Sequence, residues 1–262
     1  MKPYHHALVS ARLFGGEPDT YLPVHTAFDM SKMALGDMRH RAALHSVDHG
    51  LAVMRQAFPA RIGATDLDAV CVQHIHDDHG FSVTLDTWLS YCDPPAWTVA
   101  RRQPGRDLEG FLHSPEEACA ERWGGTPENY ADICAYYALP DMFSDHPLAP
   151  AISRNAFGIF FSETLFGAVR VIQRKDGRPY GVAVRDIGET LTLARYGHLR
   201  TLQDVLAEMK RADWMTGHRV ARSRRRRIAQ SGRADLFDDT DPRAPAEPGR
   251  ARPARARETV RS

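Results

Sequence analysis

The 262-residue sequence has few cysteines and none of the short motifs that mark the commonest enzyme classes. Its cysteines lie far apart with no C-x-x-C, which favours reduced thiols over a disulfide framework or a zinc knuckle. There is no P-loop, nucleotide-binding glycine fingerprint, G-x-S-x-G elbow or H-E-x-x-H pair. We therefore expect no nucleotide cofactor. The cysteines are Cys71, Cys92, Cys119 and Cys134.

Long apolar runs are also missing. The stretch MKPYHHALVS lacks the apolar core of a signal peptide, and the longest apolar runs, such as residues 157–161, are far too short to span a membrane. We expect a soluble, cytoplasmic protein with no membrane partner.

The formal net charge of +1 hides an uneven distribution. Residues 219–262 contain 13 arginines and 6 acidic residues, a net charge of +7, which leaves the rest of the chain acidic. Because this segment is poor in apolar residues, we expect it to be disordered. Clustered arginines can bind nucleic acid or an acidic partner. The plainer alternative is a solvated tail, since aspartates interrupt the positive run.

The sequence does contain one unit written twice. ARLFGGEPDTYLPVHTAF and AERWGGTPENYADICAYY match without a gap, and the match resumes in the stretches that begin at Ala43 and Leu67. We interpret the chain as a tandem duplication. The predicted parts are a first repeat over 1–98, a linker over 99–112, a degenerate second repeat over 113–218 and a basic tail over 219–262.

Apolar spacing predicts a mainly α fold, with one core in each of two small helical domains. An apolar stripe predicts a helix from about 39 to 58, which Pro59 ends. Gly50 and Gly158 lie inside the main helix of their unit, where close approach of another backbone explains them. Shorter helices are expected over 5–14, 21–34, 66–78 and 84–92.

Two further features concern an insertion in the second unit and the end of each unit. The second unit has nine extra residues in VRVIQRKDGRPYGVAV, where β-branched residues flank Asp176 and Gly177 and predict a minor β-hairpin. Trp97 and Trp214 occupy matching places, and we expect each to anchor the end of its unit onto its own core.

The stretch DAVCVQHIHDDHGF has the order H-x-H-x-D-H, formed by His74, His76, Asp78 and His79. It resembles the metal-binding loop of the metallo-β-lactamase superfamily, in which such residues bind two zinc ions. The repeat aligns this stretch with GETLTLARYG, which predicts a helix followed by a turn. That superfamily needs a strand and a loop, so a hydrolase of this type is the less favoured alternative.

The better candidate site comes from comparing the two units. Nine of the 13 histidines lie in the first unit, and most of their counterparts in the second are inert. The first unit therefore has a set of polar residues that the second has lost. The exchanges are His25 to Cys134, Asp29 to Ala138, His45 to Ser153, His49 to Phe157, His74 to Leu191 and Asp78 to Arg195.

Three pairs in the first unit are spaced by four residues, so on helices each pair would project from one face. Such a group could bind a divalent zinc, manganese or iron ion, and an open position on the ion would favour hydrolysis. The alternative is that several of these residues are capping or surface groups. The predicted metal ligands are His25, Asp29, His45, His49, His74 and Asp78.

The strings YHHALVSARLFGGEPDTYLPVHTAFDMSK, RHRAALHS and QHIHDDHGF, followed by TLDTWL, resemble an uncharacterised bacterial and phage family of small histidine-rich domains. The resemblance covers about residues 3–98 well and 113–216 in weaker form. It implies the helical fold and the repeat but no activity. Its polar motif falls on His5, His6, His25, Asp29, Lys32, His40, Arg41, His45, His74 and Asp78, and excludes His76 and His79.

Two functional hypotheses follow, and they do not agree on whether the protein is an enzyme. The first is a metal-dependent, hydrolytic helical domain whose second copy is a scaffold or partner. The second is a non-catalytic interaction protein, in which the paired domains form a pseudo-dimer and the basic tail binds nucleic acid or a partner.

Overall fold

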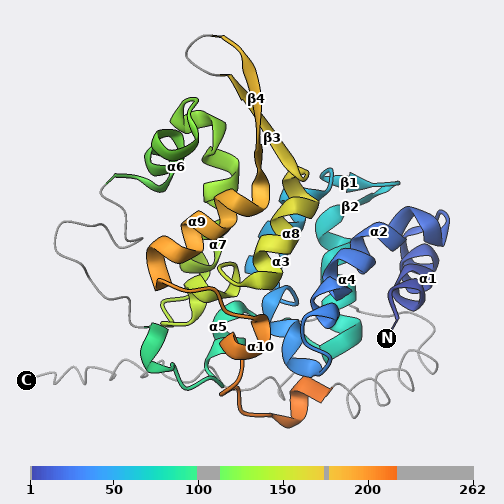
Figure 1. Ribbon diagram of the computed structural model, residues 1–262. Coiled ribbons are helices and arrows are strands. Elements are labelled where there is room, and N and C mark those ends of the chain that lie inside the picture. The colour runs from blue at the N-terminus through green and yellow to red at the C-terminus, as the bar shows by residue number, and fades with distance from the viewer. Residues whose placement is uncertain (1, 99–112, 174–176, 217–262) are drawn as a thin grey trace, which may run out of the picture.

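The computed structural model describes residues 2–98, 113–173 and 177–216 (Figure 1). The predicted linker over 99–112 and the basic segment over 219–262 lie outside the described residues. We refer to residues 2–98 as the first half and 113–216 as the second half. Both are mainly helical and each contains one small antiparallel hairpin, which confirms the predicted fold class.

The elements follow a similar order in both halves, with 3₁₀ helices labelled η, except that η1 follows the second α-helix of the first half whereas η4 precedes that of the second. In the first half they are α1 (Pro3–Phe14), α2 (Pro18–Asp29), η1 (Met30–Met33), η2 (Met38–Ala43), α3 (His49–Ala57), β1 (Arg61–Ile62), β2 (Thr65–Asp66), α4 (Leu67–His79), α5 (Leu85–Leu89) and η3 (Ala96–Thr98). In the second half they are α6 (Pro115–Trp123), η4 (Pro127–Asn129), α7 (Ala131–Phe143), η5 (Ala149–Ile152), α8 (Ala156–Phe166), β3 (Val169–Gln173), β4 (Pro179–Ala183), α9 (Val184–Tyr196), α10 (Leu202–Val205) and η6 (Asp213–Thr216).

The turn after the first helix of each half has the same geometry in both. Gly15 and Gly124 have φ angles of 80° and 88°, which residues with a side chain rarely adopt. The Tyr21 hydroxyl donates to the Gly15 carbonyl at 2.7 Å, and the Tyr130 hydroxyl donates to the Gly124 carbonyl at 2.8 Å. The same glycine and tyrosine therefore build the same corner twice.

The prediction of one long helix from about 39 to 58 is wrong, because the chain forms η2 and α3 there, with a turn between them. The Asp48 carboxylate accepts from the backbone amide of His49 at 2.7 Å, and the Ser46 hydroxyl accepts from that of Gly50 at 2.9 Å. Side-chain oxygens that satisfy the first amides of a helix start a new helix at that point. His45 consequently lies in the turn that precedes α3.

The close backbone approach expected at Gly50 and Gly158 is confirmed. A Cβ at Gly50 would lie 1.7 Å from the carbonyl oxygen of Leu44, and one at Gly158 would lie 1.8 Å from that of Ser153. Each glycine lets the preceding turn fold back against the start of its helix.

The hairpin predicted in the second half is confirmed. Strands β3 and β4 pair antiparallel, with Ile172 and Val182 buried, and they extend from the helical body in Figure 1. The smaller hairpin of β1 and β2 was not predicted, because two residues per strand are too few to show an alternating pattern.

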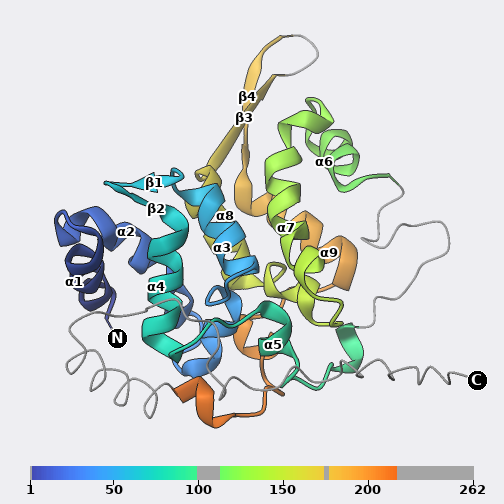
Figure 2. The same cartoon turned by 180° about the vertical axis from the view of Figure 1, so that it is seen from behind.

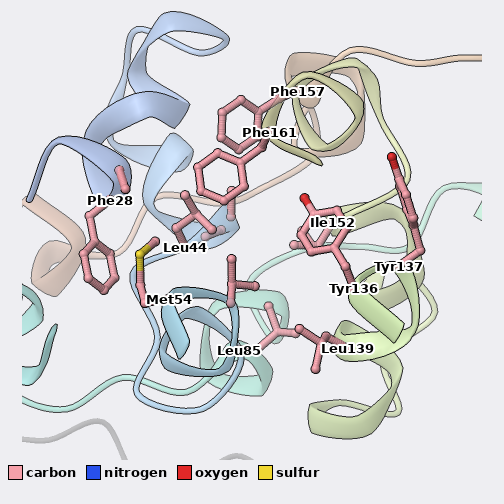
Figure 3. Close-up of a cluster of buried hydrophobic side chains, with 14 of the residues drawn as sticks. Phe28, Leu44, Met54, Leu85, Tyr136, Tyr137, Leu139, Ile152, Phe157 and Phe161 are labelled. Carbon is pink, nitrogen blue, oxygen red and sulfur yellow. The ribbon is translucent and has the colours of Figure 1, made fainter. Parts of the chain in front are cut away.

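The buried apolar side chains form one contiguous cluster instead of the two separate cores expected. Helix α3 lies between α4 and α7 and contacts both, and α5 also contacts α7 (Figure 2). Figure 3 shows Phe28 and Leu44 of the first half in the same cluster as Tyr136 and Phe161 of the second. The reason is that α3 and α5 turn apolar faces toward the second half.

Trp97 and Trp214 pack on the opposite half, which corrects the expectation that each anchors its own unit. The Trp97 ring lies 5.7 Å from that of Tyr196, and the Arg200 guanidinium lies 4.2 Å from its centroid. The Trp214 ring lies 4.8 Å from that of Trp88. The end of each half therefore extends across the other half.

None of the helices in the described ranges is long and apolar enough to cross a bilayer. The four cysteines are buried and form no disulfide.

Candidate metal centre

Four side chains of the first half converge on one buried point. Asp29 comes from the last residue of α2, His45 from the turn before α3, and His74 and Asp78 from one face of α4. One ligand atom from each residue lies within 4.8 Å of the other three. Histidine nitrogens and carboxylate oxygens at such spacing are the donor set of zinc, manganese and iron sites.

The distances between these atoms suit a single ion. His45 Nε2 lies 3.1 Å from His74 Nε2, 3.4 Å from Asp78 Oδ2 and 3.6 Å from Asp29 Oδ1. His74 Nε2 lies 4.0 Å from each of the two carboxylates. Ligands bonded to a tetrahedral zinc at about 2.1 Å are roughly 3.4 Å apart. The group can therefore bind one ion with only small movements.

The two carboxylates are buried and ionised. Burial alone would raise the pKa of Asp29. Its hydrogen bonds and charge interactions with His45 and Lys32 outweigh this effect and lower the pKa. Burial also opposes ionisation of Asp78, and its bonds with His45 and His6 again lower the pKa. Two negative charges thus face the centre of the group.

Two basic residues balance these charges. Lys32 Nζ lies 2.5 Å from Asp29 Oδ1, and Arg41 Nη2 lies 3.1 Å from Asp78 Oδ2. Arg41 also donates from Nη1 to the carbonyl oxygen of Met215 in the second half, at 3.1 Å. The second half therefore contacts a residue that holds Asp78 in place.

A chain of hydrogen bonds runs behind His74. The Asp77 carboxylate, which can only accept, takes a hydrogen bond from Gln73 Nε2 at 2.5 Å, so Gln73 Oε1 accepts from the Ser10 hydroxyl at 2.6 Å. Having used its proton, Ser10 Oγ accepts from His25 Nε2 at 2.8 Å. His25 Nδ1 is then an acceptor, and His74 Nδ1 donates to it at 2.9 Å.

This chain fixes the state of His74. Burial, reinforced by His6 and His45, lowers the pKa of His74 well below its usual value, so the ring is neutral. Burial, with His6, lowers the pKa of His25 to about 3, so that ring is neutral as well. With its one proton on Nδ1, His74 turns an unprotonated Nε2 toward Asp29 and Asp78. An imidazole held in this way is prepared to bind a metal ion.

His6 packs against both His74 and His25, and it lies next to the second oxygen of Asp78. Its Nε2 is 3.5 Å from Asp78 Oδ1, its Nδ1 is 3.2 Å from Asp77 Oδ2, and its ring lies 4.1 Å from the His74 ring. Burial opposes protonation of His6, but its bonds with Asp77 and Asp78 raise its pKa. His6 therefore links Asp78 to the hydrogen-bond chain.

Of the six ligands predicted from the sequence, the structure brings four together. His25 is adjacent to the group but is not one of the four; it orients His74 by accepting a hydrogen bond from His74 Nδ1. His49 is not in the group: it is buried, neither ring nitrogen has a hydrogen-bond partner among the residues that the structure describes, and burial lowers its pKa to about 4. The expected pairing of His45 with His49 on one helix is wrong, whereas His74 and Asp78 do share one face of α4.

The family resemblance identified more of the surroundings than the spacing did. It included His6, Lys32 and Arg41, which lie around the group, although His5 is exposed. It also included His40, whose ring lies 5.6 Å from that of His45. Burial and the neighbouring His45 lower the pKa of His40 to about 4.

Three residues of the hydrogen-bond chain, Ser10, Gln73 and Asp77, were missed. None belongs to a predicted ligand pair, and Ser10 and Gln73 are not metal-binding residue types. The signal that could have found Ser10 and Gln73 is a polar side chain at a buried helical position.

The metallo-β-lactamase interpretation is wrong. His76 and His79 lie on helix α4, which ends at Gly80 with a φ angle of 86°, so no strand precedes a metal-binding loop here. His76 Nε2 bonds Ser82 Oγ at 2.8 Å, and the His79 ring packs edge-on against Trp88. Neither belongs to the group of four.

The residues of the second half that align with the group of four have a different charge pattern. Arg195, which aligns with Asp78 in the sequence comparison, has its Nη1 4.0 Å from Asp141 Oδ2. The buried Arg154 approaches the same oxygen at 3.6 Å. Two guanidinium groups around one carboxylate form an ion-pair cluster, which does not suit a metal cation.

No curated protein and no solved structure matches the chain. A family model matches residues 1–98 and 110–215, which together make up most of the sequence. The chain therefore belongs to the family described as Domain of unknown function (DUF6915).

Proposed function

We propose that the first half binds one divalent metal ion, zinc, manganese or iron, through Asp29, His45, His74 and Asp78. The observation that carries the proposal is the unprotonated Nε2 of His74, which faces two ionised carboxylates. Carboxylate oxygens and imidazole nitrogens that converge in this way form a donor set for a divalent cation.

We further propose that the chain is a tandem duplication, with repeats over 1–98 and 113–218, whose second copy has lost the site. The similar order of elements and the matching turns at Gly15 and Gly124 support this. The second copy acts as a scaffold, because its terminal segment contacts Arg41 beside the site.

Hydrolysis is the chemistry that we assign to the loaded site. An ion that keeps an open coordination position beside the four ligands, as a five- or six-coordinate manganese or iron ion would, supplies an activated water at neutral pH. The Lys32 side chain is 35% exposed and touches Asp29, so it marks the side of the group nearest to solvent. Phosphoesters and amides are the substrates to screen.

The test of metal binding is elemental analysis of the purified, untagged full-length protein after exposure to zinc, manganese and iron. The His45→Ala, His74→Ala double variant removes two of the four ligands. The matched control is His49→Ala, which also removes a buried histidine but one outside the group. Circular dichroism confirms that each variant is helical before it is analysed.

Close to one metal ion per chain in the wild type and in His49→Ala, with loss in the double variant, supports the proposal. A wild-type protein that stays metal-free after reconstitution, or a double variant that keeps its metal, contradicts it.

The arginine-rich segment over 219–262 supports a second proposal, in which the protein binds nucleic acid or an acidic partner. Its net charge of +7 is the observation that favours this. Binding to a DNA or RNA oligonucleotide should weaken steeply as salt rises and should be lost when the segment is removed. Binding that is insensitive to salt would contradict it.

A further inference from the structure

The group of four ligands and its two basic neighbours is electrically balanced in the structure. Asp29 and Asp78 each carry one negative charge, and Lys32 and Arg41 each carry one positive charge. Metal-binding histidines are neutral, so His45 and His74 add nothing. A divalent ion would add a charge of +2 to a place where His45, His74, Asp29 and Asp78 are all buried.

The two basic residues differ in how firmly they are held. The Arg41 side chain is 13% exposed and reaches the carbonyl oxygen of Met215 at 3.1 Å and that of Asp78 at 3.5 Å, in addition to the Asp78 carboxylate. The Lys32 side chain is 35% exposed and carries its charge on a flexible four-carbon stem. Arg41 thus bridges the two halves, whereas Lys32 lies on the side of the group nearest to solvent.

Lys32 also competes directly with a metal ion. The oxygen that it touches, Asp29 Oδ1, is the same atom that faces His45 Nε2 at 3.6 Å and His74 Nε2 at 4.0 Å. An ammonium group and a divalent ion that share one carboxylate oxygen repel each other. Metal binding should therefore displace the lysine from Asp29.

We propose that the metal-loaded site takes a doubly charged oxyanion of the phosphate type, and that Lys32 moves from Asp29 to this anion. The dianion balances the charge of +2, which a buried site cannot leave uncompensated at low cost. Lysine and arginine are the side chains that proteins use to bind phosphate groups. The inference rests on the proposed metal site and makes phosphate monoesters the substrate class of that site.

The experiment measures the binding of inorganic phosphate by isothermal titration calorimetry. The full-length protein is compared in its metal-free form and after loading with one equivalent of metal and removal of the excess. The variant is Lys32→Met, which keeps the stem and removes the charge. The matched control is Lys210→Met, since Lys210 forms a similar pair with Asp93 at 2.6 Å, where both side chains are exposed.

Phosphate should bind the loaded protein at least tenfold more tightly than the metal-free protein, and acetate, with one charge, should bind more weakly than phosphate. Lys32→Met should weaken phosphate binding by about tenfold, as expected for the loss of one charged contact. The same variant should bind the metal as tightly as the wild type or more tightly, because a competing cation has been removed. Lys210→Met should change neither affinity.

Equal phosphate affinity with and without metal would overturn the inference, as would an unchanged phosphate affinity in Lys32→Met. Either result could be obtained with a protein that binds metal normally, in which case the proposed metal site would stand. A protein that binds no metal at all would instead contradict the proposed function itself.

Discussion

Cys92 and Met209 face each other in an isolated antiparallel bridge, where the end of the first half crosses the end of the second. Next to it, the backbone amide of Lys210 donates to the carbonyl of Tyr91 at 2.8 Å. Beyond this crossing Trp97 packs on the second half, and Trp214 packs on the first. Each half is therefore completed by the terminal segment of the other.

Because the terminal tryptophan of each half packs on the other half, we expect Trp97 and Trp214 to have different roles. Trp214→Ala and Trp97→Ala each remove a half-buried ring and should each lower the free energy of unfolding by about 2 kcal/mol. Only Trp214→Ala should also weaken metal binding, by about tenfold, because Met215 beside it holds Arg41 against Asp78. Urea unfolding and competition with a metal-binding dye measure the two effects.

Trp97 is the internal control, since its ring packs against Tyr196 and Arg200 and not against the metal centre. Equal metal affinity in the two variants would show that the second half does not position Arg41.

The hydrogen-bond chain predicts that Asp77 controls the proton on His74. The side-chain amide introduced by Asp77→Asn can donate a hydrogen bond to Gln73, whereas the carboxylate can only accept one. This allows the direction of every hydrogen bond through Gln73, Ser10 and His25 to reverse. The proton of His74 would then sit on Nε2, and metal affinity should fall by 10- to 100-fold. Nitrogen chemical shifts in the imidazole ring report the tautomer in the metal-free protein.

The control for this variant is Asp68→Asn on the same helix, whose carboxylate forms an exposed pair with Arg55. It should keep both the tautomer and the metal affinity of the wild type. An Asp77→Asn protein with an unchanged His74 spectrum would show that the chain does not set the proton.

His49 predicts a loss of stability in acid. Burial lowers its pKa to about 4 in the folded state, compared with about 6.5 in the unfolded chain. Because the folded state disfavours the proton, the contribution of His49 is present above pH 6.5 and is lost as the pH falls from 6.5 toward 4. By pH 5 the wild type should have lost about 2 kcal/mol through this residue.

His49→Phe should remove this loss, and Phe157 shows that the equivalent position of the second half accepts the ring. The check is urea unfolding of both proteins at pH 7.5 and pH 5. If the variant loses as much stability in acid as the wild type, the protonation of His49 is not responsible.

We expect a side chain at Gly50 to disturb the packing of the preceding turn and, through it, the metal centre. A Cβ at Gly50 would meet the Leu44 carbonyl at 1.7 Å, so Gly50→Ala must displace the turn that carries His45. We expect a loss of about 3 kcal/mol in stability together with weaker metal binding. Gly36→Ala is the control, because a Cβ there meets nothing within 4 Å. Thermal unfolding and metal titration of both variants test this, and a Gly50→Ala protein as stable as Gly36→Ala would contradict it.

The sequence was sufficient for features that depend on local patterns. The helix and turn at residues 67–80 followed from aligning the two units, and they brought His74 and Asp78 to one face of α4. The β3–β4 hairpin followed from its turn residues. In both cases the deciding contacts lie within a few residues of one another, and such contacts leave a visible pattern.

The parts that could not be predicted depend on contacts between distant residues. The break before His49 depends on Ser46 and Asp48, whose side chains compete with the helix that the apolar stripe indicated. The place of His25 behind His74 depends on how α2 packs on α4, which periodicity does not specify. The packing of Trp97 and Trp214 on the opposite halves joins residues that lie about a hundred positions or more apart in the sequence, and no local pattern reports it.

The contact between Arg41 and Met215 also has a consequence for how the protein is made. The four ligands are all synthesised by residue 78, but Met215 follows 137 residues later. At about 5–20 residues per second, this delay at the ribosome is on the order of 10 s. During that time the nascent chain contains all four ligands but lacks the carbonyl that anchors Arg41. The ligand residues are thus translated early, but the contact that anchors Arg41 beside them forms only after Met215 has been made.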